Sequence, residues 1–571
     1  MSLPAPLKLV ILTENQDTGP SARLIQRLSK IQGVEVVALV IEQYRAPFRQ
    51  RFRRAYKNDG ILGAADYFAS KCYDKASAVA LRVGGAISRL VLPISVPSQD
   101  APVSCPVEYV GSHNASSTAE LIRDKYSADL GIVYGTRILK KSTFQATRLG
   151  MLNIHKRKLP EYRGGGPIGL WELLDDQDSI TVSIHWVAEK VDQGDIVAEQ
   201  VIPIQPLDTT RSLGLKADFV GERLFCDAVE QITDGSATRI PQSELSTIEP
   251  KTFRAPSSLA LRRLRKRAES GRRERVSLFA RVYRFVSVVR WLGFLVLSGV
   301  ALRFNRRRNS GNAPVVVLYY HLVSCRRHPM AITAERLHNQ LRFLKRFFQF
   351  VDLDTAVNAI RSGSNASPLA VLTFDDGYRE NTFDTRAVCE DLQVPACHFV
   401  CSDLMGTEKP FGHDGEAGSG FVPFSIAEVK ELALDPLCQI ASHTATHFDC
   451  GSTQDADVLQ REIVGSKAKL EAMIQRPVTQ FSFPWGMPAN INEAAVDAVV
   501  DANYQAAFSA CGGVNYPESE RSSLLLKRLP TLYGDSWNDL LCLLGECLGY
   551  SSWVPWHVEP SVPTRETQEL A

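Results

Sequence analysis

The sequence predicts an α/β protein with more than one domain, and three observations carry this prediction. With 571 residues the chain is too long for one ordinary core, so we expect two or three domains. Strand-like and helix-like segments alternate in both halves, which indicates parallel sheets covered by helices. In the second half, polar residues follow several strand-like segments, as expected for active groups at the carboxyl ends of barrel strands.

The composition restricts the class of protein and its compartment. A content of 44% hydrophobic and 22% charged residues is typical of a soluble globular protein, and a net charge of +2 does not suggest a nucleic-acid partner. The 12 cysteines are scattered without a CxxC pair, which favours a reducing compartment. The amino terminus lacks the charged start and long apolar run of a signal peptide. We therefore expect a cytoplasmic protein, with membrane association as an open alternative.

The first half opens with a β-α-β pattern. Leu7 to Leu12 and Val34 to Ile41 are apolar strand-like runs, and Ala22 to Leu28 has helical spacing. Residues 44–103 interrupt the pattern with an insertion that is rich in cations. We interpret it as a solvated helical insertion, with a patch for an anionic ligand or a membrane surface as the alternative. The cations are Arg45, Arg49, Arg51, Arg53, Arg54 and Lys57.

Three polar residues in this half have the chemistry of an acyl-transfer site. Asn153 and His155 are two apart in a strand-like stretch, so their side chains share one face. An amide can donate to a developing oxyanion, and an imidazole can handle a proton. Asp192, in a turn after the strand-like run Ile180 to Val187, supplies a third group. By spacing alone, an N-x-H pair is also explained as hydrogen-bonded loop residues.

The stretches around these residues resemble the folate-dependent formyltransferase family over about residues 5–252. They read L-G-M-L-N-I-H, L-P-E-Y-R-G-G-G-P-I and V-D-Q-G-D-I-V. The resemblance implies a Rossmann-like domain that binds 10-formyltetrahydrofolate and formylates an amine. It implies that Asn153 holds the formyl oxygen, that His155 polarises the carbonyl, and that Asp192 orients His155 and receives the amine proton.

One departure from this family follows directly after the histidine. The chain reads Lys156-Arg157-Lys158 where members commonly have Pro-Ser and an apolar residue. We expect these cations to add positive charge on the acceptor side, for a phosphate such as that of a nucleotide sugar.

Residues 254–312 differ in kind and form a basic and apolar connector. A dense run of arginines and lysines comes first, and a mostly apolar segment at 285–304 follows, interrupted by Arg290. A membrane span needs about 20 apolar residues, and the basic residues on both sides give no orientation bias. We favour a helix on an anionic membrane surface, or one packed between domains, over a span.

The second half carries a candidate metal site. The segment T-F-D-D-G at residues 373–377 follows a buried strand-like run, so Asp375 and Asp376 are expected to point in different directions. His443 and His447 are four apart, and on one face of a helical turn both could reach one ion. Two histidines and one aspartate leave open positions, as in catalytic metal sites. Alone, either pair has an ordinary structural explanation.

Five stretches in this half resemble the polysaccharide deacetylase family (carbohydrate esterase family 4), over about residues 314–541. They are V-V-V-L-Y-Y-H, T-F-D-D-G, S-H-T-A-T-H, F-S-F-P-W-G and K-R-L-P. The resemblance implies a distorted (β/α) barrel that removes an N-acetyl group. The implied metal ligands are Asp376, His443 and His447. The expected ion is Zn²⁺, with nickel or cobalt as alternatives.

The same resemblance assigns the other groups of the second site. It implies that Asp375 is the general base that activates water. Pro484 and Trp485 would line the site, with the Trp485 N–H as an oxyanion donor, since Pro484 has no N–H.

The sequence also departs from this family at two places. Ser482 stands where many members have an arginine that pairs with the base, and the usual L-x-H motif of the general acid is missing near Arg528. We expect Arg528 to pair with Asp375 instead. His321 resembles an alternative acid position of the exopolysaccharide-deacetylase branch, with a structural histidine at a strand end as the other interpretation.

Together these features predict a bifunctional enzyme of amino-sugar acylation. The expected domains are a formyltransferase-like domain at 1–253, the connector at 254–312, a deacetylase-like domain at 313–545 and a tail at 546–571. The substrate would be an amino sugar on a nucleotide, lipid or polymer. Two alternatives stay open: an amino-terminal half that is a non-catalytic binding or membrane-docking module, and a metal site that removes formyl rather than acetyl groups.

Overall fold

The computed structural model describes most of both halves of the chain. The described residues are 5–43, 102–245, 250–271 without 255 and 257, 311–517 without 419, and 524–531, with isolated positions at 49–68 and 543–547. Most of the insertion at 44–103, the connector at 272–310 with its apolar segment, and the tail, apart from Cys547, lie outside them. No helix among the described residues is long and apolar enough to cross a membrane.

The chain divides into two compact units, with the boundary between Glu274 and Arg275. The first unit is built on a seven-stranded sheet of order β3-β2-β1-β4-β5-β7-β8. The strands from β1 to β5 are parallel, and β7 and β8 are antiparallel. Their bounds are β1 Leu7–Thr13, β2 Val34–Glu42, β3 Val107–Val110, β4 Leu130–Val133, β5 Gly150–His155, β7 Ser179–Trp186 and β8 Ile196–Pro203. The predicted β-α-β start is therefore confirmed.

Helices and a small second sheet complete this unit. They are α1 Gly19–Leu28, α3 Ser116–Glu120, η1 Leu121–Lys125, α4 Lys141–Phe144, α5 Leu170–Leu174, α6 Thr210–Asp234, α7 Gln242–Leu245 and α8 Ser258–Ala268, with strands β6 Tyr162–Gly164 and β9 Lys251–Phe253 paired. The long helix α6 starts at a capping box formed by Thr209 and Ser212, and ends at Gly235, whose φ is 79°.

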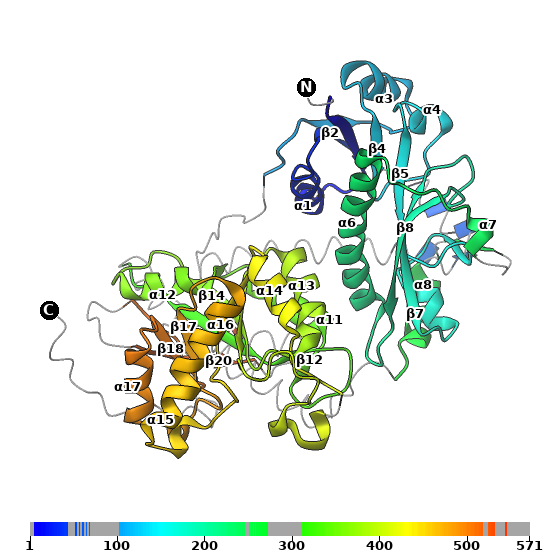
Figure 1. Cartoon of the computed structure of the whole chain (residues 1–571). Coiled ribbons are helices and arrows are strands. Elements are labelled where there is room, and N and C mark those ends of the chain that lie inside the picture. The colour runs from blue at the N-terminus through cyan, green and yellow to red at the C-terminus, as the bar shows by residue number, and fades with distance from the viewer. Residues whose placement is uncertain are drawn as a thin grey trace. The chain divides into compact units, whose positions relative to one another are not determined.

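Helix α6 fixes the position of strand β5. It packs on β7 and β8 and runs along the sheet (Figure 1). Gly221 allows this close packing, because a Cβ at that position would collide with the side chain of Ile154 on β5. Ile154 stands between Asn153 and His155, so the packing of α6 helps to hold both polar residues.

The first part of the connector belongs to the first unit. Helix α8 packs against α5. Just after it, the buried Glu269 accepts hydrogen bonds from the backbone N–H of Thr210, at 3.1 Å, and from its hydroxyl, at 2.9 Å. The outward side of α8 carries the exposed cations Arg262, Arg263, Arg265, Lys266 and Arg267.

The second unit is built on a parallel sheet of order β19-β18-β17-β16-β15-β14-β10-β20, with β13 also on β14. Strands β19 and β20 lie at opposite ends of this order, yet only Lys527 and Arg528 separate them in the chain. The two ends of the sheet must therefore lie close together, and the sheet curls into the predicted distorted barrel. The bounds are β10 Val315–Tyr320, β13 Gln349–Phe350, β14 Leu369–Phe374, β15 Ala396–Val400, β16 Cys438–Ser442, β17 Gln480–Ser482, β18 Ala506–Phe508, β19 Leu525–Leu526 and β20 Leu529–Pro530.

Helices lie around the strands of this unit (Figure 1). The α-helices are α11 Ala334–Leu344, α12 Leu353–Arg361, α13 Asp384–Leu392, α14 Ile426–Leu434, α15 Ala456–Leu459, α16 Ser466–Ile474 and α17 Glu493–Asp501. Shorter turns of helix are η2 Arg379–Thr382, η3 Gly412–Gly418, η4 Cys450–Ser452, η5 Gln460–Gly465 and η6 Pro488–Asn490, and β11 Leu322–Val323 pairs with β12 Ala331–Ile332.

The parallel register brings the ends of several strands to one edge of the barrel. Tyr320 of β10 is paired with Phe374 of β14, and Val400 of β15 with Ser442 of β16. The residues that follow these strands, which include His321, Asp375 and His443, therefore start from the same edge. This edge contains the candidate site of the second unit.

Candidate active sites

The first element of the second site is a buried ion pair between Asp375 and Arg528. The guanidinium donates two hydrogen bonds to the carboxylate, from Nη1 to Oδ1 at 2.6 Å and from Nη2 to Oδ2 at 2.8 Å. Both side chains are almost fully buried, at 4% and 1% exposed. Burial raises the pKa of Asp375, but the charge of Arg528 outweighs it, so this pKa lies below its ordinary value. The expected pair is confirmed, and Asp375 is held as a carboxylate.

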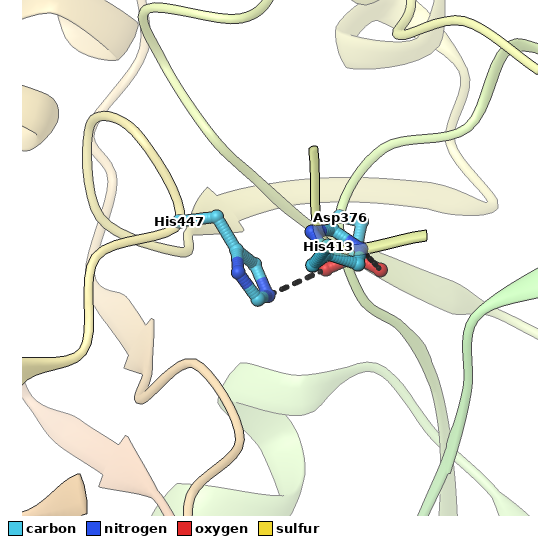
Figure 2. A group of neighbouring side chains, drawn as sticks. All are labelled: Asp376, His413 and His447. Atoms are coloured by element: carbon cyan, nitrogen blue, oxygen red, sulfur yellow. Dashed lines mark ion pairs between the residues drawn. The ribbon is translucent and has the colours of Figure 1, made fainter. Parts of the chain in front are cut away.

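Asp376 lies at the centre of a group of imidazoles. Its Oδ1 is 3.2 Å from Nε2 of His447 and 3.5 Å from Nε2 of His443, and its Oδ2 is 3.4 Å from Nε2 of His413. Figure 2 shows the rings of His413 and His447 directed at the carboxylate. Burial raises the pKa of Asp376, but the neighbouring imidazoles of His413 and His447 outweigh this and hold it well below its ordinary value.

The two histidines of the H-x3-H pair do converge, although the predicted helical turn is wrong. Residues 443–447 form a turn in which Thr444 has a φ of 65° and His447 a φ of 62°. Asp376 also has a positive φ, of 71°. Such values cost energy for residues other than glycine and occur where the surrounding structure enforces them. Here Glu462 helps, because its carboxylate accepts from the N–H and the hydroxyl of Thr446.

A group in this site fits a divalent metal ion: the ligand atoms of Asp376, His413 and His447 all lie within 4.8 Å of one another. His443 contacts Asp376 but is not part of that group. Oδ1 of Asp376 is buried and has no hydrogen-bond partner among the described residues, and two imidazole nitrogens face it. Nδ1 of His443 lies 2.8 Å from the carbonyl oxygen of Ser482, to which it must donate. Nε2 of His443 therefore carries the lone pair that a metal ligand needs. In many metal sites the second ring nitrogen of a ligating histidine donates to a carbonyl in this way. Burial also lowers the pKa of His443 to about 4, which keeps the ring neutral.

Sequence reasoning missed His413, which belongs to the same group. This histidine comes from η3, and its ligating atom lies within 4.8 Å of those of Asp376 and His447. Its ring stacks on that of His447, with centroids 4.1 Å apart. No spacing rule connects it with T-F-D-D-G or S-H-T-A-T-H. Only the local F-G-H-D-G pattern, with a histidine and an aspartate between glycines, marks the position.

The other predicted residues of this site lie at its border. His321 follows β10 directly, and its ring packs edge-on against that of Tyr319, with centroids 5.8 Å apart. Trp485 is 48% exposed, and its ring packs edge-on against His447 with centroids 4.5 Å apart. Pro484 is buried, and its carbonyl accepts from the N–H of Gly486 at 2.6 Å. That bond closes a tight turn around Trp485, whose own φ is 57°.

In the first unit, strand β5 places Asn153 and His155 as predicted, and the antiparallel partner β7 adds a third residue. The register sets Asn153 directly opposite His185, and their side chains meet at 3.1 Å between Nδ2 and Nε2. Nδ1 of His185 lies 2.9 Å from the carbonyl oxygen of Trp186, so Nδ1 carries the hydrogen and Nε2 accepts from the Asn153 amide. His185 is the functional neighbour that sequence reasoning missed in this unit.

Asp192 completes this group from a turn in which its φ is 53°. Its Oδ2 accepts a hydrogen bond from the N–H of Gly164 at 2.9 Å. The same oxygen is 3.6 Å from Nδ1 of His155, and Oδ1 is 3.8 Å from Nε2 of His185. Nε2 of His155 donates to the carbonyl of Tyr162 at 2.7 Å. Burial lowers the pKa of His155 to about 4, so both contacts with Asp192 are between a carboxylate and neutral rings.

The three cations after His155 each contact a carboxylate or carbonyl of the first unit. Lys156 pairs with Asp218, and Lys158, whose side chain is 53% exposed, is 3.2 Å from Glu161. Arg157 is buried and donates to the carbonyls of Gly165, Gly166 and Pro167, which holds the glycine-rich loop. The expectation that these cations add charge for a phosphate stays a prediction.

Comparison with known proteins finds a family match for a segment of each unit. Residues 100–229 match the formyl transferase family, and residues 362–507 match the polysaccharide deacetylase family. The methionyl-tRNA formyltransferase of Lactiplantibacillus plantarum is 30% identical over 148 residues, which cover 26% of this chain and 45% of that protein. The corresponding protein of Listeria monocytogenes is 34% identical over 128 residues, which cover 22% and 40%. The chain thus spans less than half the length of these relatives.

Solved structures were found for both units. A de-N-acetylase from Aggregatibacter actinomycetemcomitans has a TM-score of 0.33 and 21% identity, and the match covers 38% of this chain and 94% of that one. A sugar N-formyltransferase from a Shewanella species has a TM-score of 0.27 and 14% identity, and covers 43% and 76%. The two family matches, one in each unit, agree with the two resemblances that the motifs predict.

Proposed function

We propose that the second unit hydrolyses the N-acetyl group of an amino sugar, and that the first unit formylates the exposed amine with 10-formyltetrahydrofolate. The observation that carries the proposal is the pair of adjacent carboxylates in the second unit. Asp375 is bound by Arg528, and Asp376 is surrounded by imidazoles. One carboxylate is thereby fitted to take a proton, and the other to hold a divalent cation.

In the deacetylation step, Asp375 takes a proton from the attacking water. Its low pKa keeps it ionised, and Arg528 fixes the direction of its oxygens. Asp376, His443 and His447 would hold a divalent metal, Zn²⁺ first, which supplies Lewis-acid polarisation of the amide carbonyl. The backbone N–H of Trp485 donates a hydrogen bond to the carbonyl oxygen as this oxygen gains negative charge. His321 gives a proton to the leaving amine, so that acetate and a free amino sugar result.

In the formylation step, Asn153 holds the oxygen of the formyl group. One N–H of the Asn153 amide donates to Nε2 of His185, and this hydrogen bond fixes the rotation of the amide group. The other N–H of the same amide then donates to the formyl oxygen. The carbonyl gains negative charge when the amine attacks, and an amide donor stabilises that charge.

The tautomer of His155 favours this ring over Asp192, the residue that the resemblance implies, as the acceptor of the amine proton. Because Nε2 of His155 donates to Tyr162, its lone pair is on Nδ1, the atom that faces Asp192 at 3.6 Å. Once Nδ1 accepts the amine proton, the ring becomes cationic and the contact with Asp192 becomes attractive. The C–N bond to folate then breaks, and the products are a formamide and tetrahydrofolate.

The two reactions form a sequence, because deacetylation produces the amine that formylation consumes. A covalent link between two sites raises the local concentration of the intermediate. We place the sugar on a nucleotide, lipid or polymer in the cytoplasm. The exposed cations of α8 support contact with an anionic membrane surface.

The test is mass spectrometry of N-acetylated sugars incubated with the protein, Zn²⁺ and 10-formyltetrahydrofolate. We expect a loss of about 42 mass units and then a folate-dependent gain of about 28. A mass loss without any folate-dependent gain, together with no folate binding, would instead favour an amino-terminal docking module. A reaction that removes 28 mass units from N-formyl sugars, and none from N-acetyl sugars, would contradict the proposed order.

A further inference from the structure

A third imidazole faces the carboxylate that is expected to hold the metal. Nε2 of His413 is 3.4 Å from Oδ2 of Asp376, while Nε2 of His447 and of His443 are 3.2 and 3.5 Å from Oδ1. Zinc–nitrogen and zinc–oxygen bonds are about 2.1 Å, so two ligands of one tetrahedral ion are about 3.4 Å apart. His413 is therefore at the separation from Asp376 that two ligands of the same ion have.

The segment that carries His413 is held in place by buried polar contacts of the neighbouring residue. The next residue, Asp414, has a side chain that is 2% exposed, and its Oδ2 accepts from the hydroxyl of Tyr378 at 2.7 Å. Its Oδ1 is 3.5 Å from Nε2 of His328, whose side chain is 1% exposed. Nδ1 of His328 accepts from the N–H of Met330, so Nε2 carries the hydrogen and is directed at Asp414.

These contacts link the loop of His413 to the strand that carries the site. Tyr378 follows Asp376 by two residues, and its hydroxyl is also 3.4 Å from Nε2 of His413. His413 itself is 15% exposed and stacks on His447. The position of the ring is thus set by its neighbour Asp414, by Tyr378 and by stacking on the proposed ligand His447.

We propose that His413 is a further ligand of the metal in the second unit. Its ligand atom and those of Asp376 and His447 all lie within 4.8 Å of one another, and His443, which is 3.5 Å from Asp376, would be the third imidazole. The inference rests on the proposed metal-dependent function of this unit. A set with three imidazoles favours zinc, cobalt or nickel over magnesium and calcium, which prefer oxygen ligands. The site is then selective by its ligand chemistry, beyond the pair of histidines that the sequence motif contains.

The first experiment measures metal affinity rather than activity. Zn²⁺ is titrated into the full-length protein in competition with a chromophoric chelator, for the wild type, His413→Ala and a control, His338→Ala. His338 also pairs with a carboxylate, Asp391, at 2.8 Å, but lies on α11. We expect affinity to fall by about 10- to 100-fold for His413→Ala, as for loss of supporting groups in metal sites, and to stay unchanged for the control.

The second experiment separates a ligand from a residue that merely donates a hydrogen bond to Asp376. In His413→Cys, a thiolate that reaches the ion gives a sulfur-to-cobalt charge-transfer band on addition of Co²⁺. The wild type, with its own cysteines, provides the baseline. We expect a new band with a stoichiometry of one ion per chain. Thermal unfolding of the metal-free variants checks that the fold is kept.

The outcomes are distinguishable from failure of the proposed function. If the wild type binds neither Zn²⁺ nor Co²⁺, the metal-dependent function itself is contradicted. If the wild type binds one ion, but His413→Ala binds equally tightly or His413→Cys gives no new band, only the role of His413 is overturned. In that case His413 acts on Asp376 as a hydrogen-bond donor.

Discussion

The two candidate sites place carboxylates beside imidazoles in opposite electrostatic ways. In the second unit, Asp375 has a full counter-charge in Arg528, and Asp376 has three imidazoles within 3.5 Å. In the first unit, Asp192 faces two rings at 3.6 and 3.8 Å, and its one short hydrogen bond comes from a backbone N–H. The second site contains a buried ion pair, whereas in the first site the two imidazoles around the single carboxylate are uncharged.

The difference follows from what each proposed reaction, deacetylation in the second unit and formylation in the first, would need. A fully buried carboxylate without a partner is costly, so Asp375 requires Arg528, and Asp376 leaves room for a cation. Burial lowers the pKa of His155 to about 4 and also lowers that of His185, so neither carries charge until a proton arrives. Substitutions that remove a charge should therefore have the largest effect in the second site. Substitutions that remove a hydrogen bond or a positioning contact should have the largest effect in the first.

Removal of the charge on Asp375 should have the largest effect. We expect Asp375→Asn to lower kcat for deacetylation on the order of 10³-fold, because the proton acceptor is lost. Formylation by the same protein serves as the internal control and should be unchanged. Zn²⁺ binding should also persist, since Asp376 and the histidines remain. If the variant folds but no longer binds Zn²⁺, Asp375 is a ligand rather than the base.

Removal of the counter-charge should destabilise the second unit. We expect Arg528→Met to lower its free energy of unfolding by about 3–5 kcal/mol, because Asp375 is left as an unpaired buried charge. The double variant Asp375→Asn/Arg528→Met should recover part of this loss. Arg326→Met is a matched control, because Arg326 is 37% exposed in its pair with Glu380. The free energy of unfolding is measured by denaturant titration. An equal decrease in Arg528→Met and Arg326→Met would contradict the comparison.

Loss of geometry without loss of charge should damage the first site. We expect Asn153→Ala to reduce kcat for formylation by about 10²- to 10³-fold, the range for one oxyanion donor. Deacetylation should not change. His185→Ala should give a smaller loss in kcat, because it frees the Asn153 amide to rotate without removing it. An effect of His185→Ala as large as that of Asn153→Ala would show that His185 has a direct role.

The pH profile of formylation provides the smallest and most specific test. Because the pKa of His155 is lowered to about 4, the ring is neutral above that pH and able to accept a proton. The acid limb of kcat/KM should therefore lie near pH 4, below the ordinary histidine range near 6.5. Asp192 raises this pKa, so Asp192→Asn should move the limb of the residual activity to still lower pH. A limb near 6.5 in the wild type would show that His155 is not buried as a neutral ring.

The sequence by itself predicted several of the strands, the order of the two family resemblances and most residues of the two candidate sites. Burial imposes a local pattern on each element, so apolar runs predict β1, β5, β10 and β14. The polar residues that interrupt those runs, Asn153, His155 and the Asp375–Asp376 pair, stand out because they break that pattern at or just after strand ends. The pairing of Arg528 with Asp375 was predicted only because the usual arginine is replaced by Ser482.

The tertiary structure decided what pairs across elements. His185 joins Asn153 through an antiparallel register that no local pattern specifies. His413 reaches Asp376 from a loop 37 residues along the chain, and Arg528 reaches Asp375 from the place where the barrel closes. The same holds for the turn at His443–His447 and for Arg157, which donates to the carbonyls of the glycine-rich loop. The physical reason is that burial acts locally along the chain, whereas charge and metal binding act between groups that only the folded chain brings together.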